Sequence, residues 1–332
     1  MARGWLRGCV MALVGIAIVA TMALAGCAPG GSTPQTAGPM PRYQHLFVIV
    51  MENSSYDDLM GSSDAPRINA LAAEYGLATN YWSVTHPSEP NYIAMIGGDT
   101  FGVNNDNSYT VNALTAPNLA TQLVAAGLTW KSYQQSLPYA GYTGETYPTG
   151  SPLYASKHNP FMNFLGSWPA SERQAALASV VPDTQLASDL ASGSVPNFSF
   201  ISPDLCHDMH GAPSCAGGSS LIRAGDSYVS ATVDAILGSS VWKTGNSAII
   251  ITWDEADVGL SLGAPNIAAG GGRVATLVIT NHGPRGLRDA SPYNHYALLL
   301  SIEDAFGLAC LRNSCPAKGS ISPMTPLFAV VG

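Results

Sequence analysis

The chain has 332 residues, of which 46% are hydrophobic and 11% are charged, so it can bury a large globular core. Its formal net charge is −8. An acidic surface argues against nucleic acid as a partner. The chain contains no internal repeat, and its length suits one α/β domain preceded by a leader.

The N-terminal segment predicts export. Two arginines precede an apolar stretch, residues 10–24, that is too short for an ordinary membrane-spanning helix. The stretch leads into Cys27 through Leu-Ala-Gly and resembles a lipoprotein signal. That resemblance implies cleavage of residues 1–26 and a lipid on Cys27, which would anchor the protein to the outer face of the cytoplasmic membrane or the cell envelope. An ordinary secretory signal is the alternative. Residues 27–42, rich in small polar residues and proline, would form a flexible linker to a domain of residues 43–332.

Two apolar runs of the buried-strand type, residues 45–51 and 248–253, end in polar side chains that could bind a cation. These side chains are Glu52, Asn53, Asp254 and Glu255. Strands of an open α/β sheet deliver their ligand-binding residues at their carboxyl ends, so we expect the four to converge. Clustered carboxylates repel one another unless a cation neutralises them, and a divalent metal site is therefore predicted.

Residues 85–98 place Ser88 at the start of a helix. An apolar helical run that ends in two glycines follows this serine. The free N–H groups and the positive end of the helix dipole stabilise an anion at such a point. A hydroxyl beside a bound phosphate is arranged for phosphoryl transfer. The alternative is a plain helix N-cap, for which serine is among the preferred residues.

Three further positions could bind a metal or transfer a proton. Asp208 and His210 are two residues apart, so in an extended loop they would point the same way and could share an ion. His295 precedes an amphipathic helix, where a lone histidine is more often structural. His86, two residues before Ser88, is either a proton donor or a hydrogen-bonded loop histidine.

Four cysteines remain after those of the leader and the anchor, and they permit three pairings. Proximity in the sequence and an oxidising compartment favour two bridges, Cys206–Cys215 and Cys310–Cys315. The alternative is a zinc site in which the first pair binds the ion together with His207 and His210.

Apolar runs and helical patterns alternate along the chain. Strands are expected near residues 45–51, 78–84, 129–133, 198–202, 248–253 and 274–280. Helices are expected near residues 66–76, 89–97, 116–126, 183–192, 219–237 and 295–306. The alternation predicts an α/β fold, a three-layer α/β/α sandwich with a mostly parallel central sheet. Residues 136–191 break the pattern and are expected to form an inserted cap. Aromatic side chains there could stack on a substrate or pack a small core: Tyr139, Tyr142, Tyr147, Tyr154, Phe161, Phe164 and Trp168.

Five motifs resemble, in order and spacing, the bacterial phosphoesterase family, which holds secreted acid phosphatases and phosphatidylcholine-type phospholipases C within the alkaline phosphatase superfamily. They are VIVMEN (48–53), THPSEPNYIAMIGG (85–98), SPDLCHDMHG (202–211), IITWDEAD (250–257) and NHYALLLSIEDAFGL (294–308). The likeness covers residue 43 to about residue 310. It is closest to the compact acid phosphatases and implies an alkaline-phosphatase-like fold.

The resemblance also implies roles for single residues. Ser88 matches the family's nucleophile and one of its metal ligands. The other residues that match ligands of the same metal are Glu52, Asn53, Asp254 and Glu255. The residues that match second-metal ligands, or acid, base and phosphate contacts in single-metal members, are Asp208, His210 and His295. Glu255 stands where many two-metal relatives have histidine. The site could therefore hold one or two ions of calcium, magnesium, manganese or zinc.

Together these features predict a metal-dependent phosphomonoesterase of the acid phosphatase type, monomeric, acting on small phosphate esters through a phosphoserine. The proton donors and acceptors would come from His210, His295 and His86. A phospholipase C that acts on phosphodiester lipids of the adjacent membrane is the first alternative. A non-catalytic lipoprotein that captures a ligand is the second, but it gives no reason for Ser88 and the acidic residues to gather.

Overall fold

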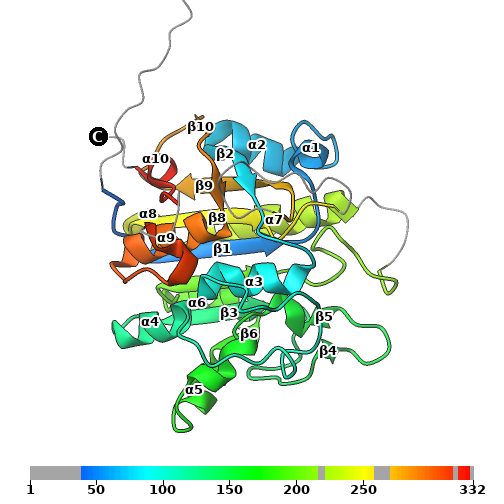
Figure 1. Cartoon of the computed structure of the whole chain (residues 1–332). Helices are drawn as coiled ribbons and strands as arrows, with labels where there is room; N and C mark the ends of the chain where they lie inside the picture. The colour runs from blue at the N-terminus through cyan, green and yellow to red at the C-terminus, as the bar shows by residue number, and fades with distance from the viewer. Residues whose placement is uncertain (1–38, 216–220, 258–269, 317–320, 330–332) are drawn as a thin grey trace, which may run out of the picture. The chain divides into compact units, whose positions relative to one another are not determined.

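The computed structural model describes residues 39–215, 221–257, 270–316 and 321–329 (Figure 1). The chain divides into two units, residues 1–36 and 37–332, and the elements below belong to the second. The predicted leader and Cys27 lie outside the described residues. None of the helices in the described part has the length and hydropathy that crossing a membrane requires.

In the described residues nine strands form the central sheet, in the order β10-β2-β9-β8-β1-β7-β3-β6 with β11 beside β2 (Figure 1). The strands are β1 (His45–Met51), β2 (Gly76–Trp82), β3 (Trp130–Gln134), β6 (Val180–Pro182), β7 (Phe198–Ser202), β8 (Ser247–Trp253), β9 (Arg273–Thr280), β10 (Arg288–Asp289) and β11 (Tyr293–Asn294). Within this sheet β9 runs antiparallel to β2 and β8, and the remaining described pairs are parallel. The near-continuous apolar sequences of β1 and β8 suit strands covered on both faces.

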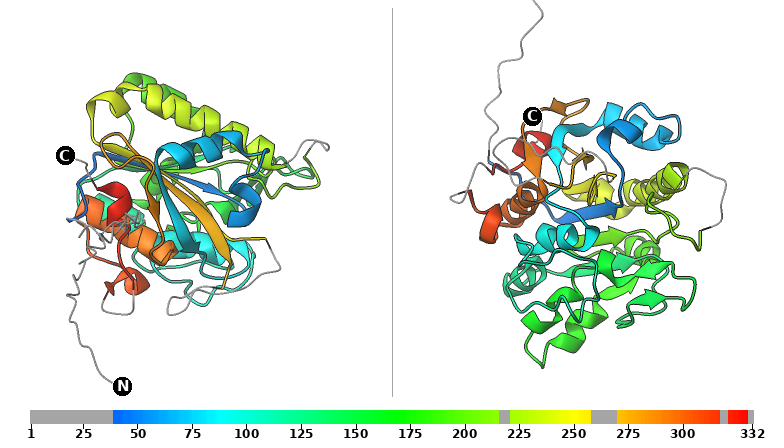
Figure 2. Two further views of the ribbon diagram at one scale, coloured as in Figure 1. Left: turned by 90° about the horizontal axis from the view of Figure 1, so that it is seen from above. Right: turned by 45° about the vertical axis from the view of Figure 1, so that its right-hand side comes forward.

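Helices cover both faces of this sheet (Figure 2). On one face α7 (Leu221–Gly238) packs against α2 (Pro66–Glu74), α6 (Gln185–Ser192) and α8 (Ser240–Thr244). On the other face α3 (Ser88–Gly97) packs against α4 (Leu119–Ala125) and α9 (His295–Phe306). The predicted α/β fold with a mostly parallel sheet between two helical layers is confirmed.

All six expected strands and all six expected helices are present, with described ends displaced by up to three residues. Short elements were missed because two to six residues carry too little periodicity to predict. They are β6, β10 and β11 with α1 (Tyr56–Leu59), α5 (Arg173–Ala178), α8, α10 (Thr325–Phe328), the hairpin β4 (Thr146–Tyr147) and β5 (Tyr154–Ala155), and the 3₁₀ turns η1 (Ser156–His158), η2 (Asn163–Ser167) and η3 (Arg312–Ser314).

The range expected to form a cap, residues 136–191, is only partly separate from the sandwich. Its last part is not a cap, because β6 extends the central sheet beside β3 and α6 belongs to a helical layer. The hairpin of β4 and β5 forms its own small sheet. Most of the aromatic side chains pack rather than project. Those of Tyr154, Phe161, Phe164 and Trp168 are buried, whereas Tyr139 is 61% exposed and Tyr147 is 41% exposed.

Candidate active site

The register of β1 and β8 brings two acidic segments together. The strands are parallel neighbours in which Met51 pairs with Trp253, so Glu52 and Asp254 emerge side by side at the carboxyl edge. The N–H of Asp254 donates to the carbonyl of Met51 at 3.0 Å, which continues the pairing by one residue. Asn53 then joins both acids of the second segment. Its N–H donates to Asp254 Oδ1 and its Nδ2 to Glu255 Oε1, each at 3.1 Å.

Ser88 faces this acidic edge from the first position of α3. Its Oγ lies 3.0 Å from Glu52 Oε2, 3.2 Å from Glu255 Oε1 and 3.4 Å from Asn53 Oδ1. One hydroxyl proton can serve only one of these acceptors at a time. The N-cap residue of α3 is Pro87, and no side chain caps the helix. The plain N-cap interpretation of Ser88 is therefore wrong, because its hydroxyl contacts carboxylates instead of helix N–H groups.

The carboxyl groups at this edge are costly to keep charged. Burial, followed by repulsion from neighbouring carboxylates, raises the pKa of Glu52 and of Asp254 well above the usual range. Burial also raises the pKa of Asp208 and that of Glu255 to about 7. Of the carboxylate oxygens of these four residues, three are buried and accept no hydrogen bond: Glu52 Oε1, Asp208 Oδ2 and Asp254 Oδ2.

Such unpartnered oxygens fit a cation. A divalent ion would neutralise the clustered charge, and an oxygen-rich ligand set suits a hard ion such as calcium, magnesium or manganese. In the described part of the chain, no group of three or more His, Cys, Asp or Glu side chains is placed so that it could hold a metal ion as it stands. The match between this site and a cation therefore rests on the unpartnered oxygens and not on a preformed coordination geometry.

His158 is a site residue to which the sequence motifs did not point. It ends η1, is 3% exposed, and stacks on the ring of Tyr92 with centroids 5.3 Å apart. Its Nε2 lies 3.1 Å from Glu52 Oε1 without hydrogen-bond geometry, and its Nδ1 lies 4.0 Å from Asp208 Oδ2. Burial lowers the pKa of His158 well below its usual value, so the ring is neutral. The feature of the sequence that could have indicated His158 is the polar run of residues 157–159 within a segment that is rich in aromatic residues.

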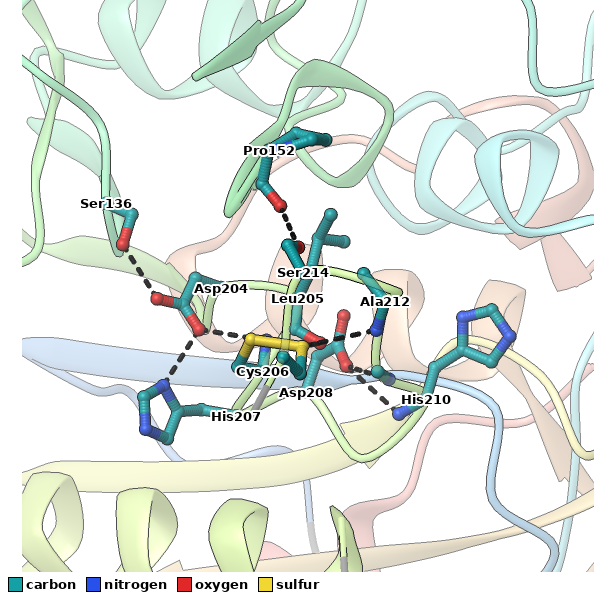
Figure 3. Close-up of a disulfide and its surroundings, with 12 residues drawn as sticks. Ser136, Pro152, Asp204, Leu205, Cys206, His207, Asp208, His210, Ala212 and Ser214 are labelled. Atoms are coloured by element: carbon teal, nitrogen blue, oxygen red, sulfur yellow. Dashed lines mark hydrogen bonds and ion pairs between the residues drawn. A yellow bond between two sulfur atoms is a disulfide. The ribbon is translucent and has the colours of Figure 1, made fainter. Parts of the chain in front are cut away.

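The loop after β7 brings Asp208, but not the ring of His210, to the acidic edge. Asp208 Oδ1 accepts the backbone N–H groups of His210 and Gly211, both at 3.0 Å. Figure 3 shows the exposed His210 ring directed away from the Asp208 carboxylate. The expectation of a shared ion assumed an extended loop. Met209 between them has a φ of 85°, so the chain turns there and the two side chains diverge.

His295 supports the site from behind and does not face Ser88. Its ring is fully buried, with Nε2 2.6 Å from the backbone carbonyl of Asp254 and Nδ1 3.0 Å from the Tyr81 hydroxyl. Since a carbonyl only accepts, Nε2 carries the proton and Nδ1 accepts from Tyr81. Burial lowers the pKa of His295 to about 4. In contrast to the expected metal or catalytic role, both ring nitrogens are engaged, and the ring holds the backbone of Asp254 in place.

His86 does lie at the site. Its Nδ1 is 2.6 Å from Glu255 Oε2, and its side chain is 21% exposed. Burial lowers the pKa of His86. Glu255 therefore contacts Ser88 through one carboxylate oxygen and His86 through the other.

Both expected disulfides are formed, Cys206–Cys215 and Cys310–Cys315. The zinc-site alternative is wrong, because bridged sulfurs are not thiolate ligands. The first bridge closes the loop that carries Asp208 (Figure 3). His207 in the same loop contacts Asp204, with Nδ1 2.8 Å from Oδ1. Structural disulfides are typical of proteins exported to an oxidising compartment.

Solved structures with the same layers define the class of fold. A protein in the alkaline phosphatase superfamily from Vibrio parahaemolyticus matches with a TM-score of 0.54 and 15% identity, over 84% of this chain and 72% of that one. The lipoteichoic acid synthase LtaP from Listeria monocytogenes matches with a TM-score of 0.54 and 9% identity, over 87% of this chain and 76% of that one. The fold is that of the alkaline phosphatase superfamily, as expected.

Sequence comparison then identifies the family. Residues 62–309 match the Phosphoesterase family. The chain is 31% identical to phosphatidylinositol-3-phosphatase of Mycobacterium tuberculosis, over 90% of this chain and 88% of that protein. It is 30% identical to an acid phosphatase of Aspergillus fumigatus, over 83% of this chain and 58% of that protein, so it spans about three fifths of that relative's length. The chain belongs to the phosphoesterase family and is an enzyme of the phosphoric ester hydrolase class.

Proposed function

We propose that this protein is a metal-dependent phosphomonoesterase that acts through a phosphoserine at Ser88. The observation that carries the proposal is the position of the Ser88 hydroxyl, within 3.4 Å of three side-chain oxygens at the carboxyl edge of the sheet. The buried, unpartnered oxygens of Glu52 and Asp254 beside it support a bound cation. The phosphatases among the relatives support the reaction class.

In the first half of the reaction Ser88 Oγ bonds to phosphorus as the bond from phosphorus to the alcohol oxygen breaks. The hydroxyl proton passes to Glu52 or Glu255, which lie 3.0 and 3.2 Å away. In the second half a water oxygen bonds to phosphorus, the bond to Oγ breaks, and Ser88 recovers a proton as phosphate leaves. A divalent ion would lower the pKa of the Ser88 hydroxyl and offset phosphate charge. The residues that would hold it are Glu52, Asn53, Asp254 and Glu255.

The direct test is phosphate release from p-nitrophenyl phosphate by the purified full-length chain. Turnover should stop after treatment with a chelator and return when a divalent ion is added back. Addition of calcium, magnesium, manganese and zinc in separate samples would identify the ion. A chelated protein that still hydrolyses the ester at its full rate would contradict the metal dependence, and no turnover with any ion would contradict the activity.

In this mechanism the proton that Glu255 takes from Ser88 passes to Nδ1 of the neutral His86 ring, 2.6 Å away, and His86 gives the proton on its other nitrogen to the leaving alcohol. We expect His86→Gln to lower kcat by about a hundredfold for an alkyl phosphate, whose alkoxide needs a proton. The loss should be only severalfold for p-nitrophenyl phosphate, which leaves as a stable anion. The measurement is kcat across esters of graded leaving-group pKa. His45→Gln, at the opposite end of β1, is the control and should change neither rate. Equal losses for both esters would exclude His86 as the acid.

The Mycobacterium tuberculosis relative suggests a membrane substrate as a second candidate. Its name specifies phosphatidylinositol 3-phosphate, which is a phosphomonoester on a lipid. Phosphate release from vesicles that contain this lipid, compared with a soluble monoester, would test it. Diacylglycerol release from phosphatidylcholine vesicles would instead support the phospholipase C alternative.

The proposal places the enzyme at the cell envelope through a lipid on Cys27. The support is the leader sequence, which ends in a small-residue run before this cysteine. Cell fractionation of wild type and Cys27→Ser is the test. A variant that still sediments with the membrane would contradict the anchor.

A further inference from the structure

Lys157 holds a positive charge beside the first turn of the nucleophile's helix. Its Nζ donates to Asp106 Oδ2 at 2.8 Å. The other oxygen of Asp106, Oδ1, accepts the N–H of Glu89 at 3.0 Å. Glu89 directly follows Ser88, so Asp106 ties the ammonium to the start of α3. The Lys157 side chain is 26% exposed, which leaves its head within reach of a ligand.

This charge acts on the carboxyl groups of the site. The ammonium of Lys157 lowers the pKa of Glu52, Asp208 and Glu255 against the larger effect of burial. Burial lowers the pKa of Lys157, but the carboxylates of Glu52 and Asp106 have the opposite effect, and the pKa lies above its usual value. Lys157 is therefore charged at any pH near neutrality.

The histidines around the site do not supply positive charge. Burial lowers the pKa of His86, of His158 and of His210, so these rings are neutral at neutral pH. A divalent ion would be offset by the carboxylates that hold it. Of the described residues whose charge lowers the pKa of both Glu52 and Glu255, Lys157 is thus the cation that is left to bind substrate.

Phosphate monoesters and diesters differ in charge. A monoester has a second pKa of about 6 and is a dianion above it, whereas a diester is a monoanion. One phosphate oxygen is charged in the monoester but carries the second ester group in the diester. An ammonium group forms its strongest hydrogen bond with this oxygen when it is charged. We infer that Lys157, tethered by Asp106, contacts this oxygen and makes the site select phosphomonoesters over phosphodiesters. The inference rests on the proposed phosphatase activity and names the substrate class of the same site.

The test compares kcat/KM for p-nitrophenyl phosphate and bis-p-nitrophenyl phosphate in wild type and Lys157→Met at pH 7.5. We expect the monoester-to-diester ratio to fall about tenfold or more in the variant. The loss of kcat/KM that Lys157→Met shows with the monoester should become smaller as pH falls below about 6, because the substrate then becomes a monoanion. A lysine that only braced α3 would not produce this dependence on substrate charge. The inhibition constants of inorganic phosphate and dimethyl phosphate give the same comparison without turnover.

Lys131 offers a matched control. Its Nζ lies 2.6 Å from Asp189 Oδ2 and its side chain is 23% exposed, so Lys131→Met removes a similar ion pair away from the site. This variant should keep the ratio, and Lys157→Arg, which keeps the charge, should retain most of it. If Lys157→Met does not fold, Lys157→Gln replaces it, because its amide can still donate to Asp106.

The outcomes separate the two proposals. Equal losses for monoester and diester in the Lys157 variant, or the same change of ratio in Lys131→Met, would overturn the role of Lys157 and leave the phosphatase activity standing. A wild type that hydrolyses neither ester would overturn the proposed function itself.

Discussion

Ser88→Ala is expected to lower kcat for p-nitrophenyl phosphate by about a thousandfold or more. The proposed reaction forms its covalent bond at Ser88 Oγ, which lies 3.0 Å from Glu52 Oε2 and 3.2 Å from Glu255 Oε1. The variant should fold normally, because the Ser88 hydroxyl caps no helix. Steady-state kinetics with a thermal melt of the same sample would check both statements.

Trapping the intermediate makes this test specific. Acid quenching of wild type during turnover, followed by mass spectrometry, should locate phosphate on the peptide that contains Ser88. Ser83→Ala is the control, since Ser83 is also buried nearby but donates to the carbonyls of Gly271 and Gly272. Full activity in Ser88→Ala, or phosphate trapped on another residue, would remove Ser88 as the nucleophile.

Asp254→Asn is expected to abolish activity and metal binding while it stabilises the metal-free protein by about 1–3 kcal/mol at pH 8. The asparagine keeps an acceptor for the N–H of Asn53, which Asp254 Oδ1 binds at 3.1 Å. It also removes one buried charge that repels Glu52 and Glu255. Elemental analysis would measure the metal, and thermal unfolding with a chelator would measure stability.

The stability of the metal-free protein should depend on pH through the same buried carboxyl groups. Burial raises the pKa of Asp208 and of Glu255 to about 7 and raises the pKa of Glu52 and of Asp254 well above their usual range, so the metal-free folded state binds more protons than the unfolded state around pH 7. Stability of the metal-free protein should therefore fall as pH rises from about 6.5 to 8. Below about 6.5 the buried histidines, whose pKa values are lowered, oppose this trend because the unfolded state then protonates them. The window above 6.5 isolates the carboxyl groups.

A buried aspartate with a cation partner is the contrast for Asp254. Asp189 accepts from Lys131 Nζ at 2.6 Å and from the Tyr133 hydroxyl at 2.7 Å. Asp189→Asn should destabilise the protein and leave its metal content unchanged, because it breaks a satisfied pair. If the metal-free Asp254→Asn variant is less stable than the metal-free wild type at pH 8, repulsion between the carboxylates does not determine the stability of this edge of the sheet.

The sequence by itself determined which strands are buried and which polar residues come directly after them. Residues 45–51 and 248–253 are apolar throughout, and a strand covered on both faces requires this pattern. Because strand ends of a mostly parallel sheet share one edge, the approach of Glu52 to Asp254 was predictable from pattern alone. The disulfide partners were predictable for a similar reason, since short separations leave few feasible pairings.

Only the tertiary structure decided which side chains face the site. His210 points away because the chain turns at Met209, and His295 faces the backbone of Asp254 because Tyr81 holds its other nitrogen. His158 arrives from a 3₁₀ turn far along the chain, and no period or spacing relates it to Glu52. Strand and helix periodicity reports which residues are buried. The direction of a side chain in a loop depends instead on single backbone dihedral angles and on partners that are distant in sequence.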